Sequence, residues 1–283
     1  MSDGLGGCRG AHPVCYYAKQ TREKCMKKKK TLSNILSNIV LAVAAGVFIF
    51  SGYKLYTIFS GYQEGSGEYK EIKKIATEKS TPPEMMDDLQ EEDLPFEVDF
   101  QALQEINKDV VGWIRFDEPR KISYPVVKGD DNEKYLNTTF EGKKNKVGAL
   151  FVDYCNAGDF SDRNTFVYGH NMKDGSMFGQ LRKYKDKSFC EENPYFYIYT
   201  LDGRKITYQV FAVSIVNDAS ESYKKSFDND GEFLQYIEYI RSISRFTSDL
   251  EIGEESKIVS LSTCTNASED ERLLVHGVKI EEK

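Results

Sequence analysis

The stretch "IVSLSTCTNASEDER" (Ile258–Arg272) joins an apolar, strand-like run to a cysteine and, eight positions later, to an arginine. The run before Cys264 predicts a β-strand that delivers the sulfur to the rim of a sheet. Arg272 starts the next strand-like run, so a short hairpin-like loop would bring its guanidinium beside the thiol. A permanent cation in that place would stabilise a thiolate or an oxyanion. Taken alone, the pair is also compatible with a buried structural thiol.

Strand-like runs dominate the chain after residue 98. They cover residues 112–116, 123–127, 149–153, 165–168, 195–200, 205–216, 257–262 and 273–280. Helical spacing interrupts them over Asp230–Ser244, and Asp99 is a suitable N-cap for a helix that begins at Phe100. Short strands, irregular loops and one long inserted helix predict a mainly β fold. We expect a closed β-barrel of about eight strands with peripheral helices.

The N-terminal part carries a membrane signal. Residues 31–53 contain no charged side chain, and 23 helical residues are long enough for a hydrocarbon core of roughly 30 Å. Lys27–Lys30 come directly before this run, which predicts a cytoplasmic N-terminus and an extracytoplasmic remainder. A cleaved signal peptide is the alternative, but the run is long and no A-x-A-like cleavage site follows it closely.

Three shorter segments follow the predicted anchor. Residues 61–67 are rich in glycine and predict a flexible stretch, and residues 68–78 predict a short helix. Residues 80–95, "STPPEMMDDLQEEDLP", are typical of an acidic linker. Before the anchor, "MKKKKTLSN" makes a conventional basic head, so Met26 is a candidate for the natural start.

The charge distribution argues against nucleic-acid binding. Residues 1–30 hold eight Lys/Arg and two Asp/Glu, whereas the remainder holds 30 Lys/Arg and 43 Asp/Glu. Neutralising phosphates requires clustered basic side chains, and the larger part of the chain is acidic. We therefore expect no nucleic-acid partner.

The six cysteines fall into two groups of three, one on each side of the anchor. Three precede it, so the extracytoplasmic part holds an odd number and at least one thiol there is unpaired. Cys155 and Cys190 could pair with each other, although two buried free thiols are the favoured alternative. No zinc spacing includes His12, and residues 227–232 lack the spacing of a calcium loop. We expect no metal and no cofactor.

Two histidines outside the N-terminal segment compete for the role of proton-transfer partner. His170 ends "NTFVYGH" and begins a glycine-containing loop, the kind of place where site residues concentrate. His276 shares strand parity with Arg272 but lies four residues further on, roughly 13 Å along an extended chain. The spacing favours His170.

Several ordered motifs together carry a family resemblance. "LSTCTN" followed by Arg272, "NTFVYGHNMKDGSMFGQL", "INKDVVGWI", "YPVVKGDDNEKYLN" and "GALFVDYCN" resemble the sortases, and in particular their class B members. These are membrane-anchored cysteine transpeptidases of Gram-positive bacteria. The resemblance runs over about residues 99–279. It implies a sortase-type barrel over residues 98–283, after a cytoplasmic N-terminus (1–30), an anchor (31–53) and an extracytoplasmic helix and linker (54–97).

The resemblance implies three catalytic residues. Cys264 would attack the carbonyl of a threonine in a sorting signal and form a thioester acyl-enzyme. His170 would protonate the leaving amine and then deprotonate the incoming amine. Arg272 would hold the substrate backbone and stabilise the oxyanion. The implied partners are surface proteins with a sorting signal, a cell-wall peptide that supplies the amine, and the membrane.

The resemblance also implies a peptide groove. The positions expected to line it are Asn132, Leu136, Tyr168, Ile243, Ser262 and Thr263. Three alternatives to the cell-wall transpeptidase remain: a sortase-like hydrolase or pilin polymerase, a cysteine peptidase of another family, and a non-catalytic barrel that binds wall or protein ligands.

Overall fold

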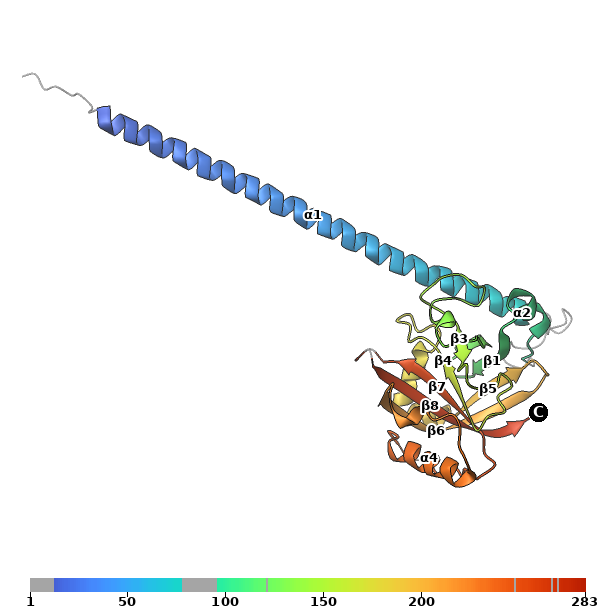
Figure 1. Cartoon of the computed structure of the whole chain (residues 1–283). Helices are drawn as coiled ribbons and strands as arrows, with labels where there is room; N and C mark the ends of the chain where they lie inside the picture. Colours follow the sequence, from blue (N-terminus) through green and yellow to red (C-terminus); the bar gives the residue numbers. More distant parts are fainter. Residues whose placement is uncertain (1–12, 78–95, 121, 247, 266, 269) are drawn as a thin grey trace, which may run out of the picture. The chain divides into compact units, whose positions relative to one another are not determined.

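The chain forms a closed barrel of eight strands in the order β1-β2-β3-β4-β7-β8-β6-β5 (Figure 1). The computed structural model describes residues 13–77 and 96–283, apart from residues 121, 247, 266 and 269. The strands are β1 (Val110–Phe116), β2 (Ser123–Val127), β3 (Leu150–Val152), β4 (Asn164–Tyr168), β5 (Tyr195–Thr200), β6 (Lys205–Asn217), β7 (Ile258–Cys264) and β8 (Glu271–Glu282). The helices are α1 (Pro13–Thr77), α2 (Phe100–Ile106), α3 (Lys187–Glu192), α4 (Asp230–Ser242) and the 3-10 helices η3 (Lys134–Leu136), η4 (Gly179–Lys185) and η5 (Glu221–Tyr223). The predicted mainly β barrel is confirmed.

The eight expected strands are all present, and their ends differ from the prediction by a few residues. Differences of two residues occur at the start of β1, at the end of β8 and at the hairpin of β7 and β8, where β7 continues to Cys264 and β8 begins at Glu271. The strands extend because Thr263 pairs with Leu273 and Cys264 pairs with Arg272. Residues at the strand ends thus pair across the hairpin and lengthen both strands, which the hydrophobic pattern does not predict.

Aromatic side chains fill much of the barrel core. Trp113 is fully buried, and its indole Nε1 donates a hydrogen bond of 3.1 Å to Ser123 Oγ. Phe196 stacks on Phe116 and on Tyr208, with ring centroids 5.1 Å apart in both pairs. Burial of large aromatic side chains is the dominant stabilising contribution for such a barrel.

The long helix α1 crosses the boundary between two compact units, residues 1–59 and 60–283. Within the described residues, one helical stretch, Lys24–Thr77, is long and apolar enough to span a membrane, and it contains the predicted anchor. The predicted acidic linker lies outside the described residues.

The expected flexible stretch at 61–67 and a separate helix after it are wrong, because both segments continue α1. Gly65 shows the physical reason. A Cβ atom at Gly65 would lie 2.8 Å from Cγ2 of Val147, so the glycine permits close packing of α1 rather than flexibility.

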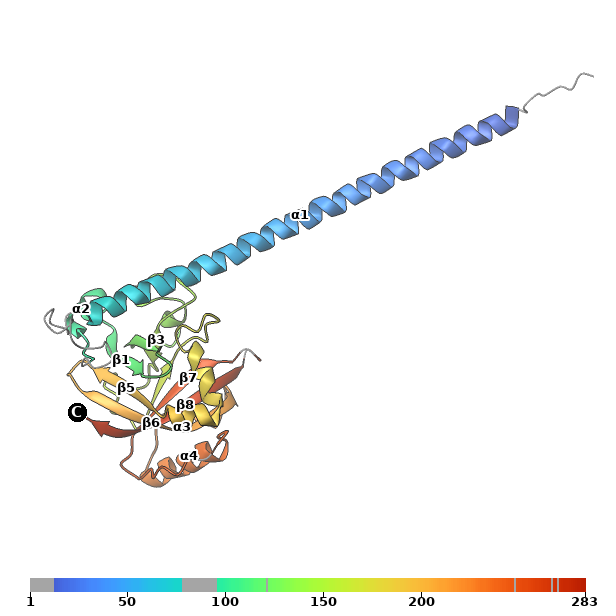
Figure 2. The same ribbon diagram turned by 180° about the vertical axis from the view of Figure 1, so that it is seen from behind.

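The inserted helix α4 lies against the outside of the barrel beside β6, as Figures 1 and 2 show. Asn229 caps it by accepting a hydrogen bond of 3.0 Å from the N–H of Glu232. A second core cluster forms beneath it, in which Phe233, Ile237 and Ile240 of α4 are buried together with Phe211 of β6. The acidic residues before α4 therefore begin a helix, as expected.

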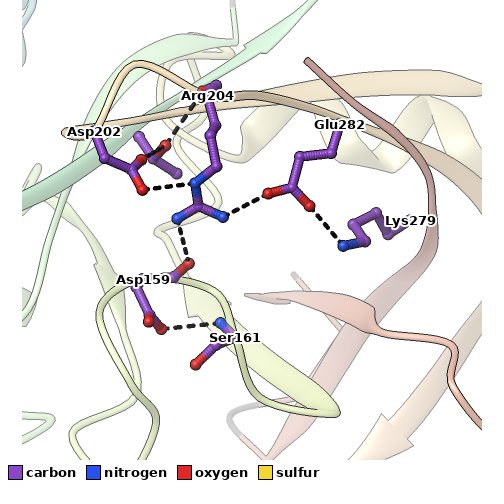
Figure 3. Close-up of polar contacts among 7 residues, drawn as sticks. Asp159, Ser161, Asp202, Arg204, Lys279 and Glu282 are labelled. Carbon is purple, nitrogen blue, oxygen red and sulfur yellow. Dashed lines mark hydrogen bonds and ion pairs between the residues drawn. The ribbon is translucent and has the colours of Figure 1, made fainter.

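The C-terminal end of β8 is tied to two loops by the guanidinium of Arg204 (Figure 3). Arg204 donates to Asp202 Oδ2 at 2.7 Å, to Glu282 Oε1 at 2.8 Å and to the carbonyl of Asp159 at 3.4 Å. Hydrogen bonds from Lys279 and from Arg204 lower the pKa of the Glu282 carboxyl to about 2. Because β8 runs antiparallel to β7, this cluster closes the barrel at the end opposite Cys264.

Candidate active site

A parallel pair of strands brings His170 and Cys264 to the same end of the barrel. Tyr168 of β4 is in register with Ser262 of β7, and the N–H of Gly169 donates to the carbonyl of Ser262 at 3.1 Å. His170 and Cys264 each follow these register partners by two residues. The side chain of Cys264 is exposed, and His170 is half-buried. A thiol and an imidazole nearly a hundred residues apart in sequence therefore share one rim of the sheet.

The antiparallel pair β7–β8 adds Arg272 as the direct register partner of Cys264. The Arg272 guanidinium donates to Asp218 Oδ2 at 3.0 Å and to the carbonyl of Glu271 at 3.2 Å. The N–H of Thr265 donates to the same carbonyl at 3.0 Å, which closes the ladder beyond Cys264. Arg272 therefore lies opposite Cys264 in the β7–β8 pair, and its guanidinium is bonded to Asp218.

His170 is held in one tautomer by the main chain. Its Nε2 lies 2.7 Å from the carbonyl oxygen of Leu136. A carbonyl oxygen only accepts, so Nε2 carries a hydrogen and Nδ1 is the nitrogen that can exchange a proton. Gly148 lies beneath this contact: a Cβ atom there would be 2.9 Å from the Leu136 oxygen and 3.1 Å from Cδ2 of His170. The hydroxyl of Tyr69 donates to the carbonyl of Gly148 at 2.6 Å and fixes that backbone.

Four of the six expected groove residues lie around this rim. Leu136 is 37% exposed and supplies the carbonyl that holds His170. The amide of Asn132 donates to Asp153 Oδ2 at 3.0 Å and accepts from the N–H of Tyr154 at 3.0 Å. Tyr168 donates to the same carboxylate oxygen at 2.8 Å. Ser262 faces the same side of β7 as Cys264.

The structure does not bring the other two, Thr263 and Ile243, to the rim. Thr263 alternates with Cys264 along β7, so its side chain lies on the opposite face of the strand from Cys264. Its hydroxyl is buried and has no hydrogen-bond partner among the described residues. Ile243 ends α4 and packs against the second core cluster. The period-two alternation of a strand was a sequence signal against Thr263. The position of Ile243 depends on where the insertion docks.

His276 is fully buried and belongs to a different polar network. Burial lowers the pKa of His276 to about 3, so the ring is neutral at physiological pH. Its Nδ1 lies 2.8 Å from Ser260 Oγ, and Ser260 in turn donates to Asn164 Oδ1 at 2.7 Å. Because Ser260 uses its hydrogen for Asn164, His276 Nδ1 carries the hydrogen of the first bond. His276 is therefore enclosed in the core, and His170 stays the predicted proton-transfer partner.

Sequence reasoning missed Tyr223, which lies in the crossover between β6 and β7. Its hydroxyl is 2.8 Å from Ser262 Oγ, and its ring stacks on Tyr168 with centroids 6.5 Å apart. Burial raises the pKa of the Tyr223 hydroxyl to about 12, against the lowering effects of Ser262 and the Arg272 cation. Tyr223 therefore stays protonated beside the thiol. No local pattern marks this tyrosine, because its position follows from the path of the crossover.

The reactive groups lie on an open rim and not in the cavity of about 560 Å³ beneath the crossover. That cavity is lined by Ser220, Glu221, Tyr223, Lys224, Glu232, Gln235, Tyr236 and Tyr239. An open rim suits an extended peptide better than a small enclosed ligand.

The other two cysteines of the barrel, Cys155 and Cys190, are free thiols. Cys190 is buried, and burial together with the Glu191 carboxylate raises the pKa of its thiol to about 12. Cys155 is exposed, which corrects the expectation that both thiols are buried. Cys155 lies in the turn after β3, where its thiol is accessible to solvent. Among the described residues, no group of three or more His, Cys, Asp or Glu could hold a metal ion.

A closed barrel that presents a thiol, an imidazole and a guanidinium at the ends of β7, β4 and β8 defines a barrel-type cysteine transpeptidase. Comparison with known proteins agrees. The sortase domain family model matches residues 118–280. The chain belongs to the sortase family, and its relatives are class B sortases.

Three relatives illustrate this similarity. The chain is 31% identical to sortase B of Listeria monocytogenes over 256 residues, which cover 89% of this chain and 98% of that protein. The crystal structure of Bacillus anthracis sortase B in complex with AAEK1 matches with a TM-score of 0.67 and 34% identity, over 79% of this chain and all of that one. The Staphylococcus aureus sortase B–substrate complex matches with a TM-score of 0.60 and 33% identity, over 64% of this chain and 84% of that one.

Proposed function

We propose that the chain cleaves a sorting signal after threonine and transfers the surface protein to a cell-wall peptide amine. The Cys264 thiolate adds to the threonine carbonyl, and the carbon–nitrogen bond to the next residue breaks as His170 protonates the leaving amine. The product is a thioester acyl-enzyme. An incoming amine then adds to the thioester, gives its proton to His170 and releases the Cys264 thiolate. One amide bond is broken and one is formed, so no redox partner is required.

One observation carries this assignment: the parallel register of β4 with β7 brings His170 and Cys264 to one rim. The hydrogen bond from His170 Nε2 to Leu136 leaves Nδ1 as the nitrogen that moves the proton. Arg272, opposite Cys264 in β8, is the cation that stabilises the oxyanion of each tetrahedral intermediate.

The sorting signal is proposed to lie across the rim between two flanks. Asn132 and Leu136 belong to the β2–β3 connection on one flank, and Tyr223 belongs to the β6–β7 crossover on the other. Tyr168 and Ser262 lie on the strands between them. The solved substrate complex of Staphylococcus aureus sortase B supports a sorting-signal peptide as the ligand class.

The cellular arrangement is part of the proposal. Residues 1–30 are cytoplasmic and residues 31–53 span the membrane. Residues 54–97 are the extracytoplasmic helix and linker that join the membrane span to the catalytic domain, which comprises residues 98–283. Support comes from the uncharged run, from Lys27–Lys30 before it, and from the helix long enough to span a membrane. This arrangement would hold the active site near membrane-bound precursors and cell-wall peptides.

The test is an acyl-enzyme trap against a library of peptides that carry candidate sorting signals. The full-length protein is incubated with each peptide, quenched with acid and analysed by mass spectrometry. We expect an adduct on Cys264 that ends at threonine, loss of the adduct in Cys264→Ala, and a transamidation product when an amine peptide is added. Absence of an adduct with every peptide would contradict the proposal. Hydrolysis in the presence of excess amine would favour a sortase-like hydrolase, and use of a pilin lysine as the amine would favour a pilin polymerase.

A further inference from the structure

A buried carboxylate lies beneath the candidate peptide groove. The side chain of Asp153, directly after β3, has no exposed surface. Its Oδ1 accepts a hydrogen bond of 2.9 Å from the N–H of Cys155. Its Oδ2 accepts from Tyr168 at 2.8 Å and from Asn132 at 3.0 Å, and it lies 2.9 Å from Nζ of Lys225. None of the steps proposed for the reaction uses this group.

The three side chains that contact Asp153 each belong to a different part of the candidate active site. Tyr168 lies two residues before His170 on β4. Asn132 lies four residues before Leu136, whose carbonyl holds His170. Lys225 lies two residues after Tyr223, which is bonded to Ser262 beside the thiol. One carboxylate is therefore connected to both flanks of the groove and to the strand between them.

The order of the strands in the sheet shows where the β6–β7 crossover is attached. The strands β3, β4, β7 and β8 are neighbours in that order. Tyr223 reaches Ser262 on β7, whereas Lys225, two residues further along the crossover, reaches Asp153 at the end of β3. The crossover is thus attached on both sides of β4, the strand that leads into His170.

The charge of Asp153 is maintained in the folded protein. Burial acts to raise the pKa of the Asp153 carboxyl, but hydrogen bonds from Lys225, Cys155 and Tyr168 outweigh it and hold that pKa below its usual range. Buried ion pairs contribute little net stability compared with apolar side chains of similar volume. An ion pair that joins two separate segments of a site is better explained by the geometry that it fixes.

We propose that Asp153 is a positioning residue of the transpeptidation reaction and that its ion pair with Lys225 fixes the distance between the two flanks of the sorting-signal groove. This inference rests on the proposed function. Loss of the ion pair would release the crossover with Tyr223 while leaving Cys264, His170 and Arg272 on their strands. Peptide binding would weaken more than the chemical step.

The experiment compares Lys225→Met with the wild type in single-turnover acylation of the full-length protein by a cleaved peptide. Lys225→Met keeps most of the side-chain length and removes the charge. We expect the half-saturating peptide concentration to rise about tenfold, with the maximal acylation rate within about twofold of wild type. Lys225→Arg retains the charge and hydrogen bonds and should recover most of the affinity.

Two further variants control for stability. Lys187→Met removes an exposed ion pair with Glu191 (3.4 Å) on α3 and should leave both kinetic quantities unchanged. Tyr168→Phe removes one hydrogen bond to Asp153 and should raise the half-saturating concentration by about two- to threefold, even if Lys225→Met does not fold. Thermal unfolding of each variant identifies any that are not folded.

The outcomes separate this inference from the proposed function. If none of the tested peptides forms an acyl-enzyme with the wild type, the proposed function is wrong, and the inference is wrong with it. If the wild type is active and Lys225→Met or Tyr168→Phe binds peptide as tightly as wild type, only the inference is overturned. A fall in the maximal rate without loss of affinity would also overturn it, because it would assign Asp153 to the chemical step.

Discussion

His170 and His276 show how one side chain takes two roles in one barrel. His170 lies half-buried at the rim, and its Nε2 is bonded to the main-chain carbonyl of Leu136. His276 lies at the centre of β8 with no exposed surface, and its Nδ1 is bonded to Ser260. Each ring makes one hydrogen bond, but the other nitrogen of His276 is buried, whereas His170 lies half-buried at the rim.

The two histidines differ in their access to solvent. Burial lowers the pKa of His276 to about 3, so the neutral ring does not take up a second proton at physiological pH. Its Nε2 is buried without a hydrogen-bond partner among the described residues, and an added proton there would be neither solvated nor paired. A histidine on the correct strand is therefore insufficient for proton transfer, and access to solvent and substrate decides the role.

The largest expected effect separates the two histidines by activity. His170→Gln should lower peptide cleavage by about a thousandfold, because it removes the group that protonates the leaving amine. The variant should unfold within a few degrees of wild type, since the ring is only half-buried. Cleavage assays and thermal unfolding check both statements, with Cys264→Ala as the inactive reference. If His276→Leu abolished cleavage and His170→Gln did not, the assignment would be reversed.

The second expected effect distinguishes His276 from His170 by the pH dependence of protein stability. The folded-state pKa of His276 is about 3 and its unfolded value is near 6.5, so the unfolded chain binds more protons between these values. The native state therefore loses stability as the pH falls below about 6.5, by at most roughly 1.4 kcal/mol per pH unit from this group. His276→Leu removes the titration. Urea unfolding at pH 7 and pH 5 should show a smaller loss in the variant than in wild type. Parallel losses would contradict the buried, neutral state of His276.

Sequence reasoning predicted the barrel, which the structure confirms, and the three candidate catalytic residues, which stay a prediction, for different reasons. Strands such as Ser123–Val127 and Tyr195–Thr200 were predicted with their observed bounds, because local apolar patterning reflects burial. Cys264, His170 and Arg272 came from ordered motifs at strand ends. These predictions required only the local sequence and a family resemblance.

The parts that sequence reasoning missed depend on contacts distant in the chain. Residues 61–67 were expected to be flexible, but Gly65 packs against Val147 in a continuous helix. Tyr223 and Lys225 reach the rim only because the crossover docks across β4. Neither a helix–loop contact nor the path of a crossover has a local pattern, so hydrophobic periodicity could not reveal them.

The third effect tests the support of His170 without changing its ring. Gly148 has φ +61°, and a Cβ atom there would lie 2.5 Å from the carbonyl oxygen of Tyr135 as well as near His170. Gly148→Ala should lower the maximal acylation rate by about tenfold, because the backbone that carries the His170 contact must move. Gly142 is a matched control, since it also has a positive φ (+81°) but nothing lies within 4 Å of its Cβ position. Gly142→Ala should introduce the same backbone strain and keep the wild-type acylation rate. An equal fall in the rate of the Gly148→Ala and Gly142→Ala variants would assign the effect to backbone strain alone.

The smallest effect extends the comparison to two serines on the same face of β7. Ser260 is bonded to buried His276, whereas Ser262, two residues closer to the thiol, lies 2.8 Å from the Tyr223 hydroxyl. Ser260→Ala should lower the free energy of unfolding by about 1–2 kcal/mol and leave peptide affinity unchanged, because it strands two buried polar groups. Tyr223→Phe should instead leave the free energy of unfolding nearly unchanged and weaken peptide binding by about two- to fivefold, which corresponds to the loss of one hydrogen bond at the rim.

A double-mutant cycle decides whether the Tyr223 effect passes through Ser262. If the hydroxyl pair acts as a unit, adding Ser262→Ala to Tyr223→Phe should weaken binding little further than either change alone. Tyr195→Phe, at an exposed position on β5, is the control for the loss of a tyrosine hydroxyl. Additive losses would mean that each side chain contacts the peptide separately. The crossover would then contribute to the groove through the ring of Tyr223 rather than through its bond to β7, whereas Ser260 and His276 would remain a purely structural pair.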